Sequence, residues 1–251
     1  MDWLMPALLS FTIGQVVSQV TVFDTTIFLH RAKTHRSIEL HRVIDWLCRF
    51  VLWLTTGLSW LEWVKIHLKH HAHTDEEGDP HSPFLMGFWS VQLGNVFHYI
   101  KQGKDKEGLA RYGTDLKEDW WDRTFFKHGL VGLGIGIAIL CWLLGVGWGL
   151  FAAGIHAVTY VFFLSSSING LCHWVGDKDF DNTATNVTLL ALVAGGEGNH
   201  NVHHGYPTSP KFSYDGSVRR EFDPAWPIIK FLVAVGLATR QHTIEERLAA
   251  R

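Results

Sequence analysis

The chain has 251 residues, of which 47% are hydrophobic and 13% aromatic, including twelve Trp. Charged residues make up only 18%, below the share of about 25% in typical soluble domains, and a net charge of −2 excludes a nucleic-acid partner held by bulk positive charge. The three Cys lie far apart, which excludes a disulfide scaffold and a Cys-based zinc ribbon. Sixteen dispersed His are the outlier of the composition.

The first apolar segment covers residues 3–29. No charged residue lies between Trp3 and Phe23, and the apolar character continues past Asp24 to Leu29. About 20 apolar residues suffice for a helix to cross a bilayer, so we expect a first membrane span here. A secretory signal is not expected, because the run has neither a basic start nor a small-residue cleavage site.

Residues 30–128 are predicted to carry interfacial helices. The apolar run 50–61 has only twelve residues between Arg49 and Glu62, which is too short to cross a bilayer and favours a re-entrant or interfacial helix. Seven basic residues lie between positions 31 and 69, and seven more between 101 and 127. Because positive residues favour the cytoplasmic side, we expect this whole segment to lie there.

Residues 129–168 are predicted to form a transmembrane hairpin. These forty consecutive residues include no Asp, Glu, Lys or Arg. A single helix of that length would be about 60 Å long, twice the hydrocarbon thickness of a bilayer. We therefore expect two spans joined by a turn near Gly145–Gly149.

Residues 169–251 are expected to form a cytoplasmic cap. The apolar run 187–196 is short, and the run 224–239 contains Lys230 and two Pro, which favours interfacial or amphipathic helices. The predicted fold is thus all-α. A single membrane domain, residues 1–251, would have about three spans, a short N-terminus outside and a helical cap inside.

Nine of the His and one Asn fall into four short groups. They are His30 and His35; His67, His70 and His71; Asn169 and His173; and His200, His203 and His204. On an α-helix, the second and fourth groups each occupy one narrow face, and Asn169 lies above His173. His30 and His35 differ by about 140°, so either they approach two neighbouring metals or the helix ends between them. The hairpin returns the chain to the same side, so all four groups are expected at the cytoplasmic surface.

Nine imidazoles exceed the four ligands of one zinc ion, and nine or ten ligands fit two five-coordinate ions. Nearby carboxylates are expected to orient metal-binding imidazoles. The candidates for this orienting role are Glu39, Asp75, Glu76, Glu77, Asp79 and Glu197, with His73 and His81 as further candidates beside the ligands. The other His are expected at the surface or in helix packing; they are His41, His98, His128, His156 and His242.

These groups resemble the three His boxes of the integral-membrane fatty acyl desaturases, specifically the delta-9 acyl-CoA and acyl-lipid branch. The stretches HRAKTHRS, EWVKIHLKHHAHTDEEGDPHSP and GEGNHNVHHGYP resemble the boxes with their flanks, and the likeness covers roughly residues 25–240. It implies a di-iron site with all nine His as direct ligands and Asn169 acting through water. Such enzymes commonly have four spans, so we expect the first of them to be missing here.

The resemblance implies insertion of a cis double bond, at delta-9, into a fatty acyl chain carried by CoA, acyl carrier protein or a lipid, with O2 as co-substrate. Because an unactivated methylene has no acidic proton and zinc is redox-inert, this reaction needs a redox-active metal. We expect the acyl chain in a dry tunnel whose walls include Trp53, Trp60 and Trp63. Lys and Arg side chains in residues 101–111 are candidates to meet the carrier's phosphates.

The electrons are expected from a separate donor. The chain has no Gly-rich dinucleotide fingerprint, no Cys set for an iron–sulfur cluster and no His-Pro-Gly-Gly of a fused cytochrome b5 domain. A ferredoxin, a rubredoxin or a cytochrome b5 with its reductase is implied. Alternatives remain: an acyl hydroxylase or acetylenase of the same superfamily, a membrane metal transporter or storage protein, or a zinc-dependent hydrolase. Against a transporter, the His groups lie outside the apolar spans.

Overall fold

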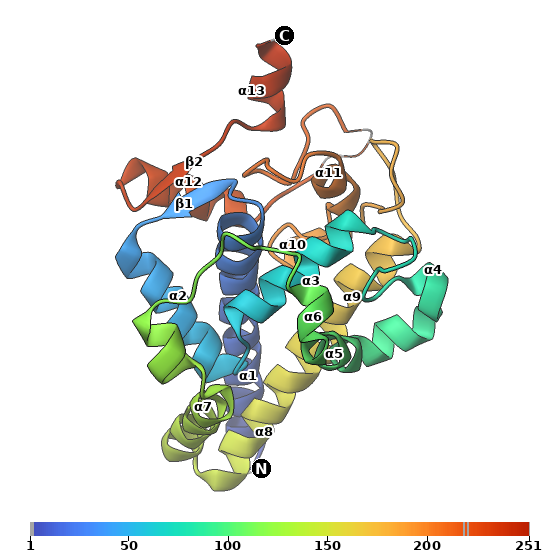
Figure 1. The fold of residues 1–251 in the computed structure, drawn as a ribbon. Helices are drawn as coiled ribbons and strands as arrows, with labels where there is room; N and C mark the ends of the chain where they lie inside the picture. The colour runs from blue at the N-terminus through green and yellow to red at the C-terminus, as the bar shows by residue number, and fades with distance from the viewer. Residues whose placement is uncertain (1–2, 218, 220, 251) are drawn as a thin grey trace.

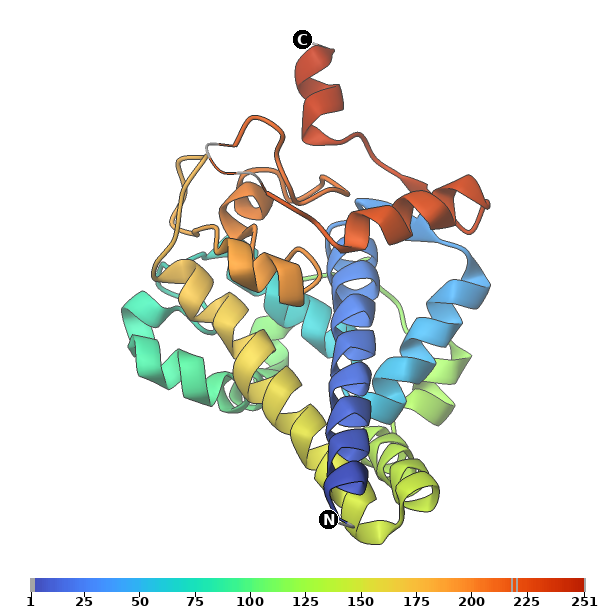
Figure 2. The same ribbon diagram turned by 180° about the vertical axis from the view of Figure 1, so that it is seen from behind.

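The structure, a computed structural model, describes residues 3–217, 219 and 221–250, and it has two layers (Figures 1 and 2). Long helices form a lower bundle that holds the N-terminus, and shorter elements form a cap above it that holds the C-terminus. Residues 1 and 2 of the predicted first span (residues 1–29) and residues 218, 220 and 251 of the predicted cap lie outside the described part.

Two continuous helical segments are long and apolar enough to cross a membrane. In the first, of 31 residues, α1 (Leu4–Asp24) continues without a break into the π-helix η1 (Thr25–Thr34). The second, Val146–His173, has 28 residues. It consists of α8 (Val146–Ala157), the π-helix η3 (Val158–Ser165), α9 (Ser166–Asn169) and the 3-10 turn η4 (Leu171–His173). The predicted hairpin reverses at Gly145, but its first arm, α7 (Gly129–Leu144), has only 16 residues.

Close helix contacts through glycine assemble the lower bundle. At Gly14 of α1, a Cβ atom would lie 2.6 Å from the carbonyl oxygen of Ala152 on α8. At Gly132 of α7, a Cβ would lie 2.3 Å from the ring of Trp53 on α2 (Arg42–Thr55). Small residues of this kind let helix backbones approach closely within a membrane, where apolar burial gives little attraction.

The apolar run 50–61, expected as one re-entrant or interfacial helix, is not a single helix. It is divided between the end of α2 and the start of α3 (Trp60–Ala72). Gly57, at a φ of 67°, bends the chain, and the side chain of Ser59 caps α3 by accepting a hydrogen bond from the backbone N–H of Glu62. This bend lets α3 turn away from the bundle and carry the second His group to the cap.

The cap contains short helices and one small sheet, so the prediction of an all-α fold needs a correction. Strands β1 (Ile38–Leu40) and β2 (Ala238–Arg240) pair antiparallel, with Ile38 opposite Arg240. The run 224–239 accordingly forms α12 and the start of β2. The remaining elements are α4 (Pro83–Met86), α5 (Phe88–Lys104), α6 (Lys106–Leu109), η2 (Asp122–Phe126), α10 (Thr188–Val193), α11 (His200–Gly205), α12 (Ala225–Ala234) and α13 (Ile244–Ala249).

Buried apolar clusters fix the elements that carry the His groups. Phe28 and Leu29 of η1 pack against Leu52 of α2 and against Trp60 and Val64 of α3. A second cluster joins the two long helical segments to α10; it consists of Val22, Tyr160, Leu164, Cys172, Leu190 and Ala194. The side chains that follow these residues, such as His30 and His67, are therefore held at the boundary between bundle and cap.

Candidate metal centre

The nine His named from the sequence lie in two groups beneath the cap. In each group the candidate ligand atoms all lie within 4.8 Å of one another. Group one consists of His30, His35, His67, His71 and His203, and group two consists of His70, His173, His200 and His204. Two helices contribute to both groups, because α3 carries His67, His70 and His71, and α11 carries His200, His203 and His204.

His30 and His35 enter the same group because their helix is a π-helix. The backbone N–H of His35 donates to the carbonyl of His30, at 3.1 Å. In this i→i+5 geometry, residues five apart lie nearly one above the other. In an α-helix, which turns by 100° per residue, the same two side chains would point about 140° apart. Both alternatives raised from the sequence, two separate metals or a helix that ends between the residues, assumed α-helical geometry. The structure does not support two separate metals, because both rings lie in one group, but η1 does end at Thr34, between the two residues, with His35 as its C-cap.

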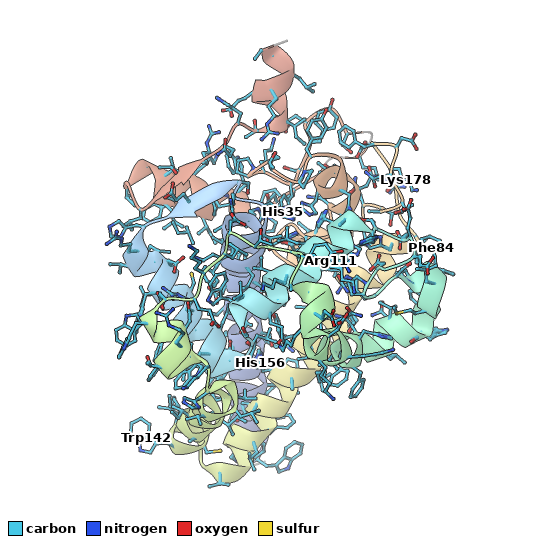
Figure 3. All side chains as sticks on the ribbon, in the orientation of Figure 1. His35, Phe84, Arg111, Trp142, His156 and Lys178 are labelled. Atoms are coloured by element: carbon cyan, nitrogen blue, oxygen red, sulfur yellow. The ribbon has the colours of Figure 1, made fainter. Side chains whose placement is uncertain are left out.

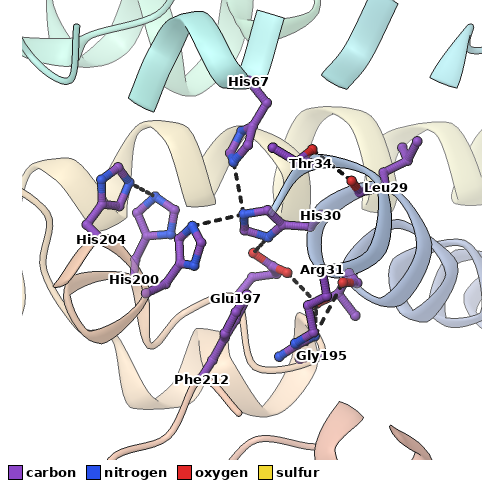
Figure 4. Close-up of polar contacts among 12 residues, drawn as sticks. Leu29, His30, Arg31, Thr34, His67, Gly195, Glu197, His200, His204 and Phe212 are labelled. Atoms are coloured by element: carbon purple, nitrogen blue, oxygen red, sulfur yellow. Dashed lines mark hydrogen bonds and ion pairs between the residues drawn. The ribbon is translucent and has the colours of Figure 1, made fainter. Parts of the chain in front are cut away.

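Group one has the geometry of a ligand set. The Nε2 atoms of His30, His67, His71 and His203 form a closed ring with sides of 2.9, 3.1, 3.0 and 3.0 Å. Nitrogen atoms bound at right angles to one metal, about 2.1 Å away, lie about 3.0 Å apart. The buried Nε2 of His35, in the same group, has no hydrogen-bond partner among the residues that the structure describes. These donors fit a transition-metal ion, and Figure 4 shows two of them, His30 and His67, with their Nε2 atoms facing each other.

Group two repeats this arrangement with four rings. Nε2 of His200 lies 3.0 Å from Nε2 of His173 and 3.2 Å from Nε2 of His204. The Nε2 atom of His70 is buried without a hydrogen-bond partner. Imidazole donors alone suit Fe, Cu, Ni or Zn, so this group also fits a transition-metal ion.

Three buried carboxylates orient one ring each. Nδ1 of His30 lies 2.6 Å from Glu197, Nδ1 of His70 lies 3.0 Å from Asp79, and Nδ1 of His173 lies 2.8 Å from Asp75. Because a carboxylate accepts the Nδ1 proton, the Nε2 lone pair of each ring is directed into its group. Figure 4 shows this relationship for Glu197, whose other oxygen accepts a hydrogen bond from Thr26.

Four of the proposed orienting residues do not have that role. Glu39, Glu76 and Glu77 are exposed, and neither group includes them. His73 ends α3 and bonds through Nε2 to the hydroxyl of Tyr112, at 2.9 Å. His81 does lie beside a ligand, with its fully buried ring stacked on His70 at a centroid distance of 4.5 Å.

Burial favours the neutral form of most imidazoles in the two groups, and metal binding requires that form. Burial first, and then repulsion from neighbouring imidazoles, lowers the pKa of His67, His71, His203 and His204 well below the ordinary value. Although burial opposes ionisation of Glu197, His30 and Arg31 hold the pKa of that carboxyl below its usual range. The pocket therefore combines neutral nitrogen donors with a carboxylate that stays charged.

Asn169 lies outside both groups. Its side-chain NH2 donates to the amide oxygen of Asn95, at 3.0 Å. It also lines a small cavity of about 50 Å³ together with His30, His67 and Glu197. The expected stacking of Asn169 above His173 on one α-helix is not found, because α9 ends at Asn169 and a separate 3-10 turn carries His173.

An apolar cavity of about 410 Å³ lies next to this small cavity, within the bundle. The two cavities are adjacent, because both are lined by Trp63, Tyr99, Tyr160 and Ser165. The larger cavity continues between α2, α7 and α8; residues that line it include Leu54, Leu58, Leu133, Ile137, Leu140 and Ala153.

Of the three Trp predicted to line a tunnel, only Trp63 lies on this cavity. Trp53 and Trp60 instead line a separate cavity of about 60 Å³ next to Asp122. The indole N–H of Trp60 donates to Asp122, and that of Trp53 donates to the carbonyl of His128. The structure therefore places Trp53 and Trp60 on a different cavity from Trp63.

The remaining His serve packing or lie at the surface. His156 is buried between helices, where its ring bonds to Ser18 and to the carbonyl of Thr55. His41 caps α2, and His98 bonds to Ser90. His128 and His242 are exposed.

The residues whose ion pair and cation–π contact join the cap to η1 were not identified from the sequence. Arg31, beside His30, is fully buried and forms an ion pair with Asp223 at 2.8 Å. Its guanidinium also lies 3.7 Å from the ring centroid of Phe212, as part of the surroundings drawn in Figure 4. The sequence signal was present as a basic residue directly after a ligand, but nothing in the chain indicated Asp223 as its partner.

Comparison with known proteins gives this geometry a context. The sequence model described as "Fatty acid desaturase" matches residues 2–225. The chain belongs to the fatty acid desaturase family. It is 32% identical to Delta-9 desaturase-like 2 protein of Arabidopsis thaliana, an alignment that covers 92% of this chain and 76% of the relative. It is also 32% identical to Delta-9 acyl-lipid desaturase 2 of the same plant, over 85% and 68% of the two chains.

The desaturase is also similar to a relative named for another double-bond position. Acyl-CoA C20 Delta5-desaturase of Anemone leveillei is 32% identical, over 87% of this chain and 69% of that relative. The family membership and the delta-9 relatives place the chain in the delta-9 branch. The protein is therefore an oxidoreductase that acts on fatty acyl chains, and the family resemblance predicted from the His boxes is confirmed.

Proposed function

We propose that this desaturase uses a di-iron centre and O2 to insert a cis double bond at the delta-9 position of an acyl chain. One observation supports this most strongly. The apolar cavity adjoins a small chamber lined by His30 and His67 of group one, and Trp63, Tyr99 and Tyr160 line both. An acyl chain seated there would have one methylene pair next to the candidate metal centre.

The two His groups would hold one iron each, and Asn169 would act through a water molecule. Two bound irons would supply the O2-dependent redox chemistry that removes hydrogen from an unactivated methylene. Glu197, Asp79 and Asp75 would hold the Nδ1 protons of their rings, so that each Nε2 remains a donor.

The cavity walls would select the reacting carbons by position. An apolar chain offers no polar group to recognise, so only the length and shape of the cavity separate one CH2 from the next. Trp63 stacks on His67, with ring centroids 4.9 Å apart, and would fix the chain beside group one. Tyr160, bonded to Thr25 at 2.7 Å, would close the opposite wall and help to exclude water.

The membrane placement follows from the two long segments and α7. We propose three spans: α1 with η1, α7, and the segment that begins with α8. The N-terminus would lie outside, and the cap with the metal centre would face the cytoplasm, because the basic residues gather on that side. Lys101, Lys104, Lys106 and Arg111 would meet phosphates of the acyl carrier or of lipid headgroups.

The substrate and donor follow from chemistry and from the relatives. Relatives are named as acyl-lipid and as acyl-CoA desaturases, so the proposed substrate is an acyl-CoA or an acyl lipid, with acyl carrier protein as a further possible carrier. A separate ferredoxin, rubredoxin or cytochrome b5 with its reductase would deliver the electrons.

The test is expression in a desaturase-deficient microbe supplied with these donors, followed by fatty-acid profiling with location of the double bond. New cis-monoenes from the wild-type chain and from His128→Ala, but not from His203→Ala, would support the proposal. His128 is the matched control because it is exposed and lies outside both groups. Hydroxy or alkynyl products would show that the enzyme is an acyl hydroxylase or an acetylenase instead of a desaturase. A purified protein with bound zinc and no iron would overturn the di-iron proposal.

A further inference from the structure

Helix α5 has one face that no other part of the described chain covers. Trp89, Leu93, Phe97 and Ile100 recur at spacings of four, four and three, which places them along one stripe of the helix. Trp89 is 69% exposed and Phe97 is 65% exposed, whereas Val91 on the opposite face is fully buried. Large apolar side chains exposed in a row mark a surface that is covered by a partner or by lipid.

The neighbouring α4 extends this stripe. Phe84 and Leu85 are 55% and 54% exposed, and Phe84 lies at the outer edge of the molecule in Figure 3. Both helices project to one side of the bundle, and α5 lies across the upper part of the long helices rather than along them (Figures 1 and 2). A 17-residue helix in this orientation does not cross a bilayer, but it can lie along the membrane surface.

Charge and continuity identify the occupant of this surface. The apolar stripe ends in the exposed Lys101 and Lys104, followed by Lys106, which is the arrangement that meets anionic headgroups. The inner face of α5 packs against η3 and α9, whose own outer residues, such as Phe163, face the surroundings of the second long segment. The two exposed apolar surfaces thus belong to neighbouring elements at one level.

We propose that α4 and α5 form a membrane-interface anchor, with the apolar stripe buried among lipid chains and the lysines at the headgroups. The inference rests on the membrane placement given in the proposed function. The anchor also bears on the active site, because the inner face of α5 supplies Asn95 and Tyr99 to the cavity walls. Lipid binding on one face of α5 therefore holds the reaction chamber on the other.

The test places a photocrosslinking residue, p-benzoylphenylalanine, at position 97 of the full chain. The protein is reconstituted in nanodiscs of phosphatidylcholine and phosphatidylglycerol and irradiated. Intact mass spectrometry then detects the added mass of a crosslinked lipid. Position 93 serves as a second site on the stripe in case substitution at 97 prevents folding. Position 163 on η3 reports the membrane span itself. Position 248 on α13, at the far end of the cap, is the exposed negative control.

We expect phospholipid adducts at 97, 93 and 163, and none at 248. Adducts at 163 without any at 97 or 93 would overturn the anchor while leaving the span intact. An absence of adducts at all of these positions would overturn both the anchor and the membrane placement on which it rests. Crosslinks from 97 to another protein, in place of lipid, would also overturn the anchor.

Discussion

A carboxylate oxygen of Glu197 lies 2.6 Å from Nδ1 of His30, and both side chains are buried beneath the cap. The pair joins the loop before the third His group to the first one, so residues far apart in the chain fix one ring between them. Glu197 also accepts a hydrogen bond from Thr26, one turn earlier on the same π-helix as His30. The orientation of His30 therefore depends on a contact between the cap and the first span.

Replacing Glu197 by Gln should weaken metal binding without removing any proposed ligand. Loss of the charged acceptor leaves the His30 tautomer unfixed, and such outer contacts are typically worth about 10–100-fold in metal affinity or activity. Iron content of the purified protein, measured against a chelator series, gives the result. Glu77→Gln is the matched control, because Glu77 is exposed. Equal iron retention in both variants would contradict the proposed role of Glu197.

Replacing Asp223 by Asn should destabilise the cap. The change leaves the guanidinium of Arg31 fully buried without its counter-charge, and loss of one partner from such a pair typically costs about 3–5 kcal/mol. Thermal unfolding in detergent should start at a clearly lower temperature. Lys106→Ala, which removes the largely exposed pair with Glu62, should leave the unfolding temperature unchanged. Similar unfolding temperatures for the two variants would show that the Arg31 pair does not hold the cap.

Replacing Ala153 by Leu should shift the product spectrum toward shorter acyl chains. Ala153 lines the large cavity, and the added side chain takes space that the acyl chain would use. A misfit of this size typically changes discrimination by about tenfold, so the ratio of shorter to longer monoenes should rise by about that factor. Val158→Leu adds volume at an exposed position and should leave the profile unchanged. An unchanged profile for Ala153→Leu would place the acyl chain elsewhere.

The stability of the cap should fall as the pH rises through neutrality. Burial, with a further contribution from Asp179, raises the pKa of Glu221 to about 7. Because this pKa is higher in the folded chain than in the unfolded chain, protonated Glu221 favours folding below about pH 4.5, and that contribution is lost as the pH rises through 7. Unfolding temperatures of the wild type should therefore drop more between pH 5 and 8 than those of Glu221→Gln. Parallel pH profiles would contradict this assignment.

The sequence was enough to predict what depends on spacing along the chain. The turn at Gly145 and the nine His that gather beneath the cap follow from charge-free length and from His spacing. Contacts between segments far apart in the chain could not be predicted from spacing. Six carboxylates had suitable positions in the sequence, but only the fold shows that Glu197 reaches His30 while Glu39 points to solvent.

Other differences arise from local geometry that the residue pattern does not reveal. The 140° separation of His30 and His35 assumed an α-helix, and the π-helix η1 removed it. Trp53 and Trp60 were expected on the tunnel because their run was apolar, but both line a separate cavity next to Asp122. The apolar stripe of α5 was missed because Gln92, Asn95 and His98 interrupt it in the linear sequence.

The division of α3 and α11 between the two His groups has a consequence for assembly of the centre. Each helix is a rigid rod with ligands for both positions, so a metal that draws α11 into place in one group also brings its remaining ligands to the other. Binding of the first ion then carries the entropic cost of ordering these helices, and binding of the second ion does not carry it again. Uptake of the first ion should therefore favour uptake of the second, and a half-loaded centre should be a minor species.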